Sequence, residues 1–549
     1  MPKSKCSALE TAILCLLILS CTAVFVAPLF VHYLEADGQL SIHWIDHFTE
    51  QYRRGIFWPR WMPHAFAGLG SPTFYFYPPF AFFVTGLCSL LFAHQSAQTL
   101  YFIAAYLGTG ASILTFFVLS AEFTQERNLR LLSSFFYGLA PYHVFVELKR
   151  GGLAEHFGFI WPPIILYCAL QLLRQNKVRI KDFVIGSVSF SLLVYSHIPT
   201  TLVFGLSILA PLLVLSIRNR RIGWVLGMLA SGSLLAAPYI LPVLAHTEDV
   251  QLRWLCLDPD GTPDALLSFS KFLTKANYTA SLNILVGYFG MLLLAIALFL
   301  EWKHKRVWII RLLLVCTIVV LLLNNTTLSR PIWNLFHLNE YIQYPYRWLV
   351  TGTLIVSASI ALSGSTIHRM RILPTLALWA LAGLLFAGLK IADIRGHSVL
   401  GFWSPYEPAE YAPATASHDY NSVIAFATAH RNDPFILSND TALHTKDLAQ
   451  ENLAFRDSII TPHGAIVTLH HWYWPDWKAY IDGREIKQSS DNNGRPMIAV
   501  PGGSHLLRYQ LETSQSEIIG CWIGCFGVLT LCFTGLVLRR NRSESTAKI

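Results

Sequence analysis

Long apolar runs separated by short groups of lysine and arginine dominate this chain. The first run, residues 9–34, is longer than the roughly 7–15 residues of a signal-peptide core and lacks a convincing cleavage site, so we expect a retained helix. Charged residues make up only 13% of the 549 residues, against about 25% in a typical soluble domain. The sequence therefore predicts an α-helical polytopic membrane protein.

The basic groups predict the topology. They recur between the apolar runs, at residues 3–5, 127–130, 174–181, 218–221, 303–311, 369–371 and 539–548, rather than in one patch suited to nucleic acid. All of them fall on the cytoplasmic side, as positive charge prefers, only if residues 74–93 stay on the outer surface. We therefore expect cytoplasmic termini and about twelve membrane helices, at residues 9–34, 99–120, 131–146, 157–173, 183–196, 199–216, 222–245, 281–300, 308–323, 348–364, 373–391 and 517–538.

Composition changes between residues 392 and 516, where turn pairs such as Asp482-Gly483 alternate with short segments such as PMIAV and HLLRYQL. This pattern is typical of β-strands. Trp472, Tyr473, Trp474 and Trp477 offer rings that could stack on sugars, but aromatic residues in a small sandwich are more often core or membrane-interface residues. We predict three parts: a transmembrane domain at 1–391 with a large first outer loop at 35–98, an extracytoplasmic β domain at 392–516, and a final helix with a basic tail at 517–549.

Ionisable residues gather in the segments that this topology places outside. Residues of this kind at a membrane boundary are candidates for function, although snorkelling side chains and structural ion pairs give the same pattern. In the first outer loop they include the carboxylates Asp37 and Asp46. The substrate-binding candidates are His43, His47, Arg150, Glu155, His197 and Arg347.

An ordered set of short motifs carries a resemblance to a known family. The motifs are ADGQLSIHW, FWPRW, GLGSPTFYFYPP, KRGGLAEHFGF, YSHIPT, YPYRWL and WPDWKAYIDGREI. Together they resemble the bacterial and archaeal membrane proteins labelled 6-pyruvoyl-tetrahydropterin synthase-related, which are similar in architecture to the GT-C glycosyltransferases. The resemblance runs nearly end to end. It implies a GT-C-like fold and transfer of a sugar from a polyprenyl-phosphate carrier to a lipid or glycan acceptor on the outer face of the cytoplasmic membrane.

The resemblance also implies a role for Asp37. GT-C enzymes place an acidic residue after the first helix as the acid/base group, and Asp37, followed by Gly38, occupies the matching position, with Asp46 as second candidate. Independently of the family, a carboxylate that removes a hydroxyl proton assists displacement at an anomeric carbon, and one carboxylate suffices for a single inverting step.

The departing phosphate needs fixed cations. Arg150 and Arg347 offer bidentate guanidinium groups, with His197 as a third donor. If the two arginines share one phosphate, their guanidinium groups should lie within about 15 Å of each other, a few times hydrogen-bond reach.

Two other classes of function stay open. A transporter or flippase for lipid-linked glycans should show an internal repeat, and we see none; a non-catalytic scaffold requires no such feature. The sequence contains no Walker, Rossmann, metal-type Cys/His or serine-hydrolase motif. We therefore expect no cofactor and assign no metal ligand, although GT-C relatives differ in their need for a divalent metal. The expected partners are the polyprenyl-phosphate sugar donor, the acceptor and membrane lipids, without nucleic acid.

Overall fold

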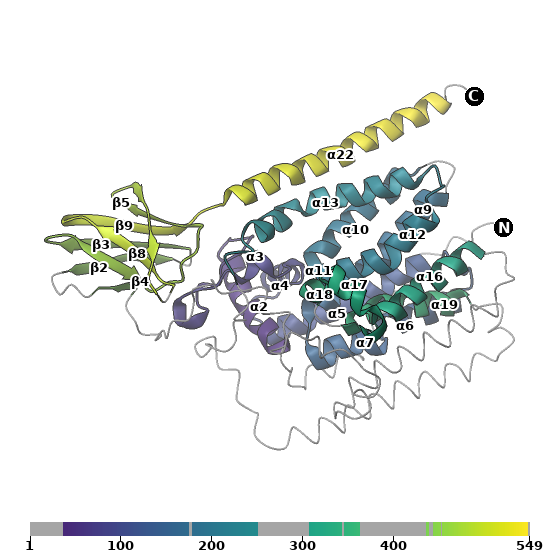
Figure 1. Cartoon of the computed structure of the whole chain (residues 1–549), viewed down its shortest axis with the longest axis horizontal. Coiled ribbons are helices and arrows are strands. Elements are labelled where there is room, and N and C mark those ends of the chain that lie inside the picture. The colour runs from purple at the N-terminus through teal and green to yellow at the C-terminus, as the bar shows by residue number, and fades with distance from the viewer. Residues whose placement is uncertain are drawn as a thin grey trace, which may run out of the picture.

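The computed structural model describes residues 37–174, 178–250, 307–324, 326–342, 345–362, 435–438, 443–451, 453–492 and 494–546. A helical body, a β region and a long C-terminal helix make up the molecule (Figure 1). The predicted membrane helices at 9–34, 281–300 and 373–391 lie outside the described residues, as do residues 392–434 of the predicted β domain.

The longest helices of the body coincide with the apolar runs. They are α5 (Ala97–Ser120), α9 (Trp161–Arg174), α10 (Ile180–Ser196), α13 (Ile222–Ala245), α16 (Val307–Asn324) and α19 (Leu349–Leu362). Shorter pieces connect them: α6 (Arg127–Gly138), α7 (Pro141–Val144), the π-helix η3 (Phe145–Arg150), α8 (Leu153–Gly158), α11 (Ile198–Phe204), the π-helix η4 (Gly205–Leu209), α12 (Ala210–Leu215), α17 (Thr326–Leu335), α18 (Leu338–Ile342) and the 3₁₀-helix η6 (Pro345–Trp348). Buried residues from most of these helices form one apolar core.

Five helical stretches in the described residues are long and apolar enough to cross a membrane. They are Ala97–Ser120, Leu153–Arg174, Ile198–Leu215, Ile222–Ala245 and Gln515–Val537. Shorter apolar helices cover Trp308–Leu323 and Leu349–Leu362. The molecule is thus mostly helical with several apolar spans, while the predicted number of about twelve is not confirmed.

One predicted span, residues 131–146, is wrong as a continuous helix. Helix α6 ends at Gly138 and α7 begins at Pro141. Proline has no N–H to donate to the preceding turn, so the backbone breaks at this point. The chain then continues into η3, whose wider turns carry Arg150 as their last residue.

The segment after residue 36 was predicted as a large outer loop, and much of it is helical. It contains α2 (Asp37–Arg53), the 3₁₀-helix η2 (Phe66–Gly68), α3 (Thr73–Phe76) and α4 (Phe80–Leu91). These elements lie between the β region and the rest of the helical body (Figure 1). Helix α4 has 12 residues, about 18 Å at 1.5 Å per residue, which is short of a hydrocarbon core of about 30 Å.

The predicted β-strands are present in two antiparallel sheets. One has the order β1-β4-β8-β7 and the other β2-β3-β9-β5-β6. Alternating burial along β5 and β8 places one face of each strand in the core. The strands are β1 (Ile436–Leu437), β2 (His444–Glu451), β3 (Ala454–Thr461), β4 (Ala465–Leu469), β5 (Trp477–Ile481), β6 (Arg484–Ile486), β7 (Ser489–Ser490), β8 (Pro496–Val500) and β9 (Gly503–Leu511).

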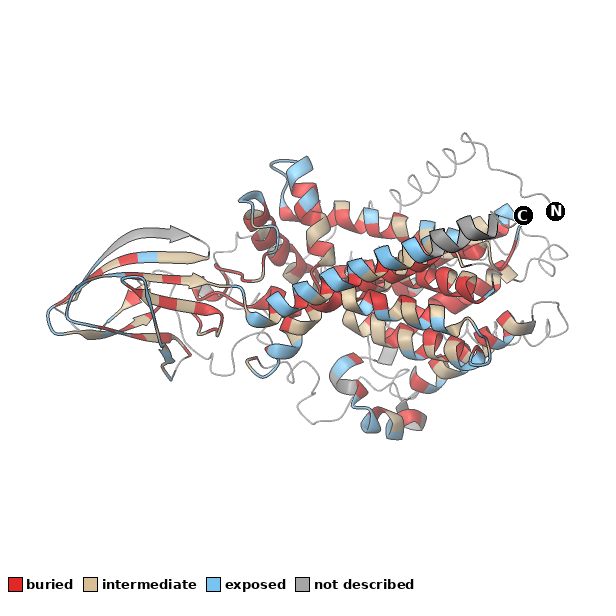
Figure 2. Ribbon diagram, turned by 90° about the horizontal axis from the view of Figure 1, so that it is seen from above, coloured by how far each residue is buried: buried red, intermediate tan, exposed pale blue. Residues whose placement is uncertain are grey.

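Helix α22 (Gln515–Thr546) runs from the β region along α13 (Figure 1). Gly520, Gly524 and Gly527 face α13, and a Cβ at Gly520 would lie 2.8 Å from the Ala237 carbonyl oxygen, so only a small residue permits this approach. The opposite side of α22 is exposed (Figure 2). It presents Trp522, Phe526, Leu529 and Phe533, as a face toward lipid requires.

A cluster that we call the aromatic junction joins the β region to the segment after α2. Its members are Trp61, Tyr75, His246, His471, Trp474, Asp476 and Trp477. The Trp61 ring stacks on His471 with centroids 4.8 Å apart, and the Tyr75 hydroxyl donates to Asp476 Oδ2 over 2.9 Å. Trp472, Trp474 and Trp477 are all buried. The predicted core role of these three tryptophans is therefore confirmed. Their buried rings leave no face on which a sugar could stack, so that alternative is wrong for them.

Candidate functional site

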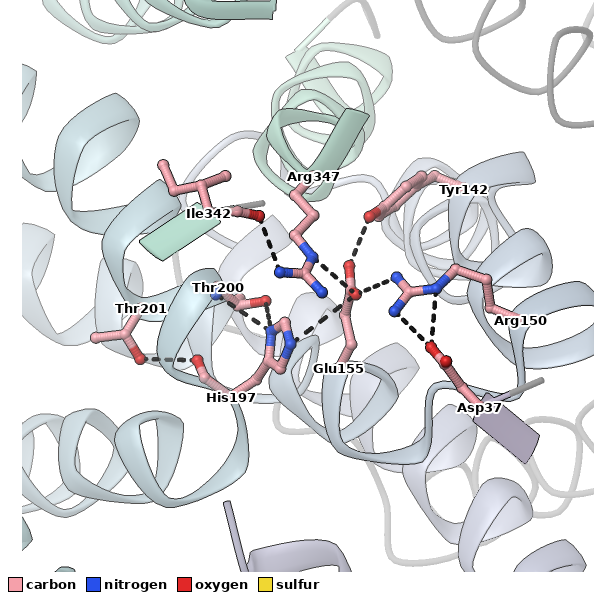
Figure 3. A network of polar contacts seen from close by, with 9 residues as sticks. All are labelled: Asp37, Tyr142, Arg150, Glu155, His197, Thr200, Thr201, Ile342 and Arg347. Atoms are coloured by element: carbon pink, nitrogen blue, oxygen red, sulfur yellow. Dashed lines mark hydrogen bonds and ion pairs between the residues drawn. The ribbon is translucent and has the colours of Figure 1, made fainter. Parts of the chain in front are cut away.

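A network of charged side chains joins five segments of the helical body (Figure 3). Arg150, at the end of η3, donates to two carboxylates: Nε and Nη2 reach Asp37 Oδ2 over 3.2 and 2.7 Å, and Nη1 reaches Glu155 Oε2 over 2.7 Å. Asp37 is the first residue of α2, and Glu155 lies on α8. Arg150 therefore links an acid from the start of the described chain to an acid on a membrane-spanning stretch.

The second arginine converges on the same carboxylate oxygen. Arg347 on η6 places its Nε 3.6 Å from Glu155 Oε2 and donates through Nη1 to the Ile342 carbonyl over 2.9 Å. Arg150 and Arg347, almost two hundred positions apart in sequence, thus contact one atom. The expected convergence of the two guanidinium groups is confirmed, whereas their role in phosphate binding remains a proposal.

His197 completes this side of the network. It lies between α10 and α11, where its Nδ1 accepts from the backbone N–H of Thr200 over 3.2 Å, and its Nε2 is 4.0 Å from Glu155 Oε2. Because Nδ1 is an acceptor, the proton of a neutral ring is on Nε2, which faces the carboxylate. The imidazole therefore presents an N–H toward Glu155.

Exposure falls steadily across the network. The Asp37 side chain is 41% exposed, Arg150 17%, and Glu155 only 1%. Glu155 also accepts from Tyr142 over 2.5 Å. A ligand therefore meets Asp37 and Arg150 first, and Glu155 lies behind them as the shared anion of two arginines.

A close backbone approach positions Asp37 against Arg150. The residue after η3, Gly151, has φ +68°, a left-handed conformation that glycine adopts without strain. A Cβ at Gly151 would lie 2.4 Å from the Gly38 Cα. The Ser41 hydroxyl spans the same contact, with its Oγ 2.7 Å from the Asp37 carbonyl and 3.3 Å from that of Gly151. The two glycines let the first turn of α2 touch the end of η3.

Two tyrosines beside the network were missed by the sequence analysis. Tyr142 donates to Glu155, and Tyr77 lies in the electrostatic field of Asp37, Arg150, Glu155 and Arg347. The chain contains 22 tyrosines, and no spacing distinguishes these two from the others. Only their position in the fold identifies them.

The remaining predicted residues lie further along α2. At 1.5 Å per residue, His43, Asp46 and His47 are about 9 to 15 Å along the helix axis from Asp37. His47 is buried and stacks on His64 with centroids 5.9 Å apart. Burial lowers the pKa of His47 to about 3, with a further lowering from His64. His47 is thus packed inside the fold, and its role in substrate binding stays a prediction.

The described residues contain no group of three or more His, Cys, Asp or Glu side chains arranged to hold a metal ion. The charged network has a different composition, with two arginines against two carboxylates. The charges of this set balance, so an anion binds here in place of one of the carboxylates, and the guanidinium fork matches two oxygens of a carboxylate or of a phosphate.

Two solved structures have a partly similar fold. The Archaeoglobus fulgidus oligosaccharyltransferase, in complex with Zn and sulfate, matches with a TM-score of 0.42 and 13% identity over 66% of this chain and 51% of that chain. ArnT from Cupriavidus metallidurans, bound to undecaprenyl phosphate, matches with a TM-score of 0.28 and 11% identity over 65% and 78%. The chain thus spans about half the length of the archaeal protein.

No protein family and no curated protein matches the chain. The resemblance to the 6-pyruvoyl-tetrahydropterin synthase-related proteins therefore stays a sequence prediction. Both TM-scores are below 0.5, so the function proposed next is based on this chain's own residues.

Proposed function

We propose that this chain is a membrane glycosyltransferase of GT-C type. In this proposal it moves a sugar from a polyprenyl-phosphate carrier to a lipid or glycan acceptor at the outer face of the cytoplasmic membrane. The single observation that carries it is the network itself: a half-exposed carboxylate, Asp37, is bound to the first of two arginines that share one buried anion. The proposed base, Asp37, is thereby in direct contact with the first proposed phosphate ligand, Arg150.

The proposed step is one displacement at the anomeric carbon. The acceptor oxygen bonds to this carbon as the bond to the carrier phosphate oxygen breaks, and the electron pair leaves with the phosphate. The hydroxyl proton passes to the Asp37 carboxylate. Arg150 and Arg347 offset the charge that develops on the phosphate, an effect that is strong where water is scarce. One displacement inverts the configuration of the anomeric carbon.

Glu155 and His197 act as positioning residues in this proposal. Two guanidinium groups repel each other, and the buried Glu155 carboxylate offsets this repulsion by binding both. Tyr142 and the His197 ring fix the orientation of that carboxylate. Glu155 was predicted to bind substrate, and its burial behind Arg150 favours a supporting role.

The test is transfer by purified protein in lipid nanodiscs, with polyprenyl-phosphate-linked monosaccharides as donors and lipid or glycan acceptors. Asp37→Asn keeps the shape and removes the base, so we expect transfer to fall by at least about 100-fold with unchanged thermal unfolding. Glu50→Gln removes one charge from the same helix and should transfer normally, and Asp46→Asn should have a mild effect. Near wild-type transfer by Asp37→Asn would exclude Asp37 as the base.

The same preparation separates the alternatives. A flippase moves a fluorescent lipid-linked sugar across the bilayer without forming a new glycoside, and a scaffold does neither. Glycoside formation by the wild-type protein therefore distinguishes the enzyme from both.

A further inference from the structure

Arg150 is already bound by two anions, and these differ in one important respect. Asp37 takes two donors of the guanidinium, Nε and Nη2, and Glu155 takes the third, Nη1. The Asp37 side chain is 41% exposed and the Glu155 side chain 1%. Only the first of the two contacts can be exchanged from solvent.

The buried contact is not exchangeable because Glu155 serves two arginines. Without it, Arg150 and Arg347 would face each other across the space where its Oε2 now lies. Removing one partner from a buried ion pair is strongly unfavourable. Asp37 is different: its carboxylate stands at the N-terminus of α2, where the helix dipole stabilises an anion even without Arg150.

The phosphate of the carrier has the chemistry to replace Asp37. A sugar-linked polyprenyl phosphate is a phosphodiester with one negative charge, the same charge as the carboxylate. It also presents two oxygens to the guanidinium fork, as the bidentate geometry requires. Exchange of one for the other leaves the charge bound to Arg150 unchanged, while the released carboxylate stays beside the site as an anion.

We propose that the carrier phosphate and the Asp37 carboxylate compete for Arg150, so that binding of the phosphate releases the carboxylate toward the acceptor. This inference rests on the function proposed above. Both Arg150 donors bind one oxygen of Asp37, Oδ2, and hold the carboxylate against the arginine, whereas a released carboxylate can turn this oxygen to the acceptor and take its proton. Arg150 thereby couples carrier binding to the availability of the base. When no carrier is bound, Asp37 stays bound to Arg150 and does not activate water or another hydroxyl.

The experiment measures binding without transfer. The probe is farnesyl phosphate, a short polyprenyl phosphate, titrated into the protein in nanodiscs and followed by calorimetry. The titration is run at about pH 5, where this monoester carries one negative charge, as the phosphodiester of the carrier does. Asp37→Asn removes the competing charge but keeps the side-chain shape, and we expect about tenfold tighter binding, less so at high salt. Asp37→Ser provides a second variant in case the first folds poorly. Glu50→Gln removes a charge about 20 Å further along α2 and should bind like the wild type.

The outcomes distinguish this inference from the proposed function. If the wild type binds farnesyl phosphate and neither Asp37 variant binds it more tightly, the competition is wrong while the carrier site stands. If no form of the protein binds the probe at low or high salt, the carrier site fails as well, and the inference with it. Tighter binding by Asp37→Asn together with lost transfer supports both.

Discussion

The charged network and the aromatic junction both join distant parts of the chain, but by opposite means. The network brings Asp37, Arg150, Glu155 and Arg347 together through ion pairs of 2.7 to 3.6 Å. The junction brings Trp61 against His471, Trp474 and Trp477 through rings with centroids 4.8 to 6.3 Å apart. Charge dominates the contacts of the network, and buried rings dominate those of the junction.

This difference determines what each region can do: the network can exchange an ion-pair partner for a ligand, whereas the junction can only support the fold. Ion pairs at a partly exposed site can change partner, because a ligand of like charge replaces one member without leaving a cavity. Buried rings cannot do so, since each removed ring leaves a void that the surroundings fill only in part. We therefore expect substitutions in the network to change binding and rate, and substitutions in the junction to change stability.

The largest effect on stability is expected at Trp61. Its side chain is fully buried between the β region and the segment after α2. Trp61→Ala should lower the free energy of unfolding by about 3–5 kcal/mol. Thermal unfolding and chymotrypsin release of the β region measure this. Trp58→Ala is the matched control, because Trp58 is 40% exposed in the same loop. Equal unfolding of the two variants would contradict a supporting junction.

A somewhat smaller effect, on rate rather than stability, is expected at Gly151. Alanine at φ +68° is strained by about 1–2 kcal/mol, and its Cβ would press on Gly38, so Asp37 and Arg150 must move apart. We expect transfer to fall about 100-fold, the usual result of a misplacement near 1 Å.

Gly152→Ala is the control for this change. Gly152 has φ −77°, and a Cβ there would lie 3.4 Å from the nearest atom, Val146 Cγ1. If the two alanine variants transferred at the same rate, the approach of Gly38 and Gly151 would have no part in positioning the base.

The sequence was sufficient to select the members of the network, because charge at a membrane boundary is costly and therefore informative. That argument predicts Arg150, Glu155, His197 and Arg347, the family resemblance predicts Asp37, and all five meet in the fold. Sequence could not show that Glu155 binds both arginines, since this depends on where α8 and η6 pack. The sequence predicts a loop around His43, Asp46 and His47, which would let them approach Arg150. They lie instead on helix α2, whose rise carries them away from the arginine that binds Asp37.

Hydropathy predicted α5 and α13 well, because both are uninterrupted apolar runs. It failed at residues 131–146, where Pro141 breaks the helix and the π-helix η3 follows. A π-turn has no periodic signature in so short a segment. The junction was likewise invisible, because nothing in the sequence pairs Trp61 with a ring more than four hundred residues away.

The smallest predicted effect is a pH dependence of the junction through His246. Burial lowers the pKa of His246, but the hydrogen bond to Asp249 and the nearby Asp476 carboxylate outweigh it and raise the pKa to about 9. The Nδ1 to Asp249 Oδ2 distance is 2.8 Å and the Nε2 to Asp476 Oδ2 distance is 3.4 Å. Because the folded pKa lies above the unfolded value near 6.5, the stabilisation is complete below pH 6.5 and is lost as pH rises through about 9.

His246→Gln should therefore lower the unfolding temperature at pH 6 and have little effect at pH 9.5. His505→Gln is the matched control, because His505 forms a comparable pair with Asp482, 2.6 Å apart, in an exposed contact where solvent screens the charges. Its effect should be smaller at every pH. A destabilisation by His246→Gln that is equal at pH 6 and pH 9.5 would show that His246 supports the junction by packing alone, as its aromatic neighbours do, and not by charge.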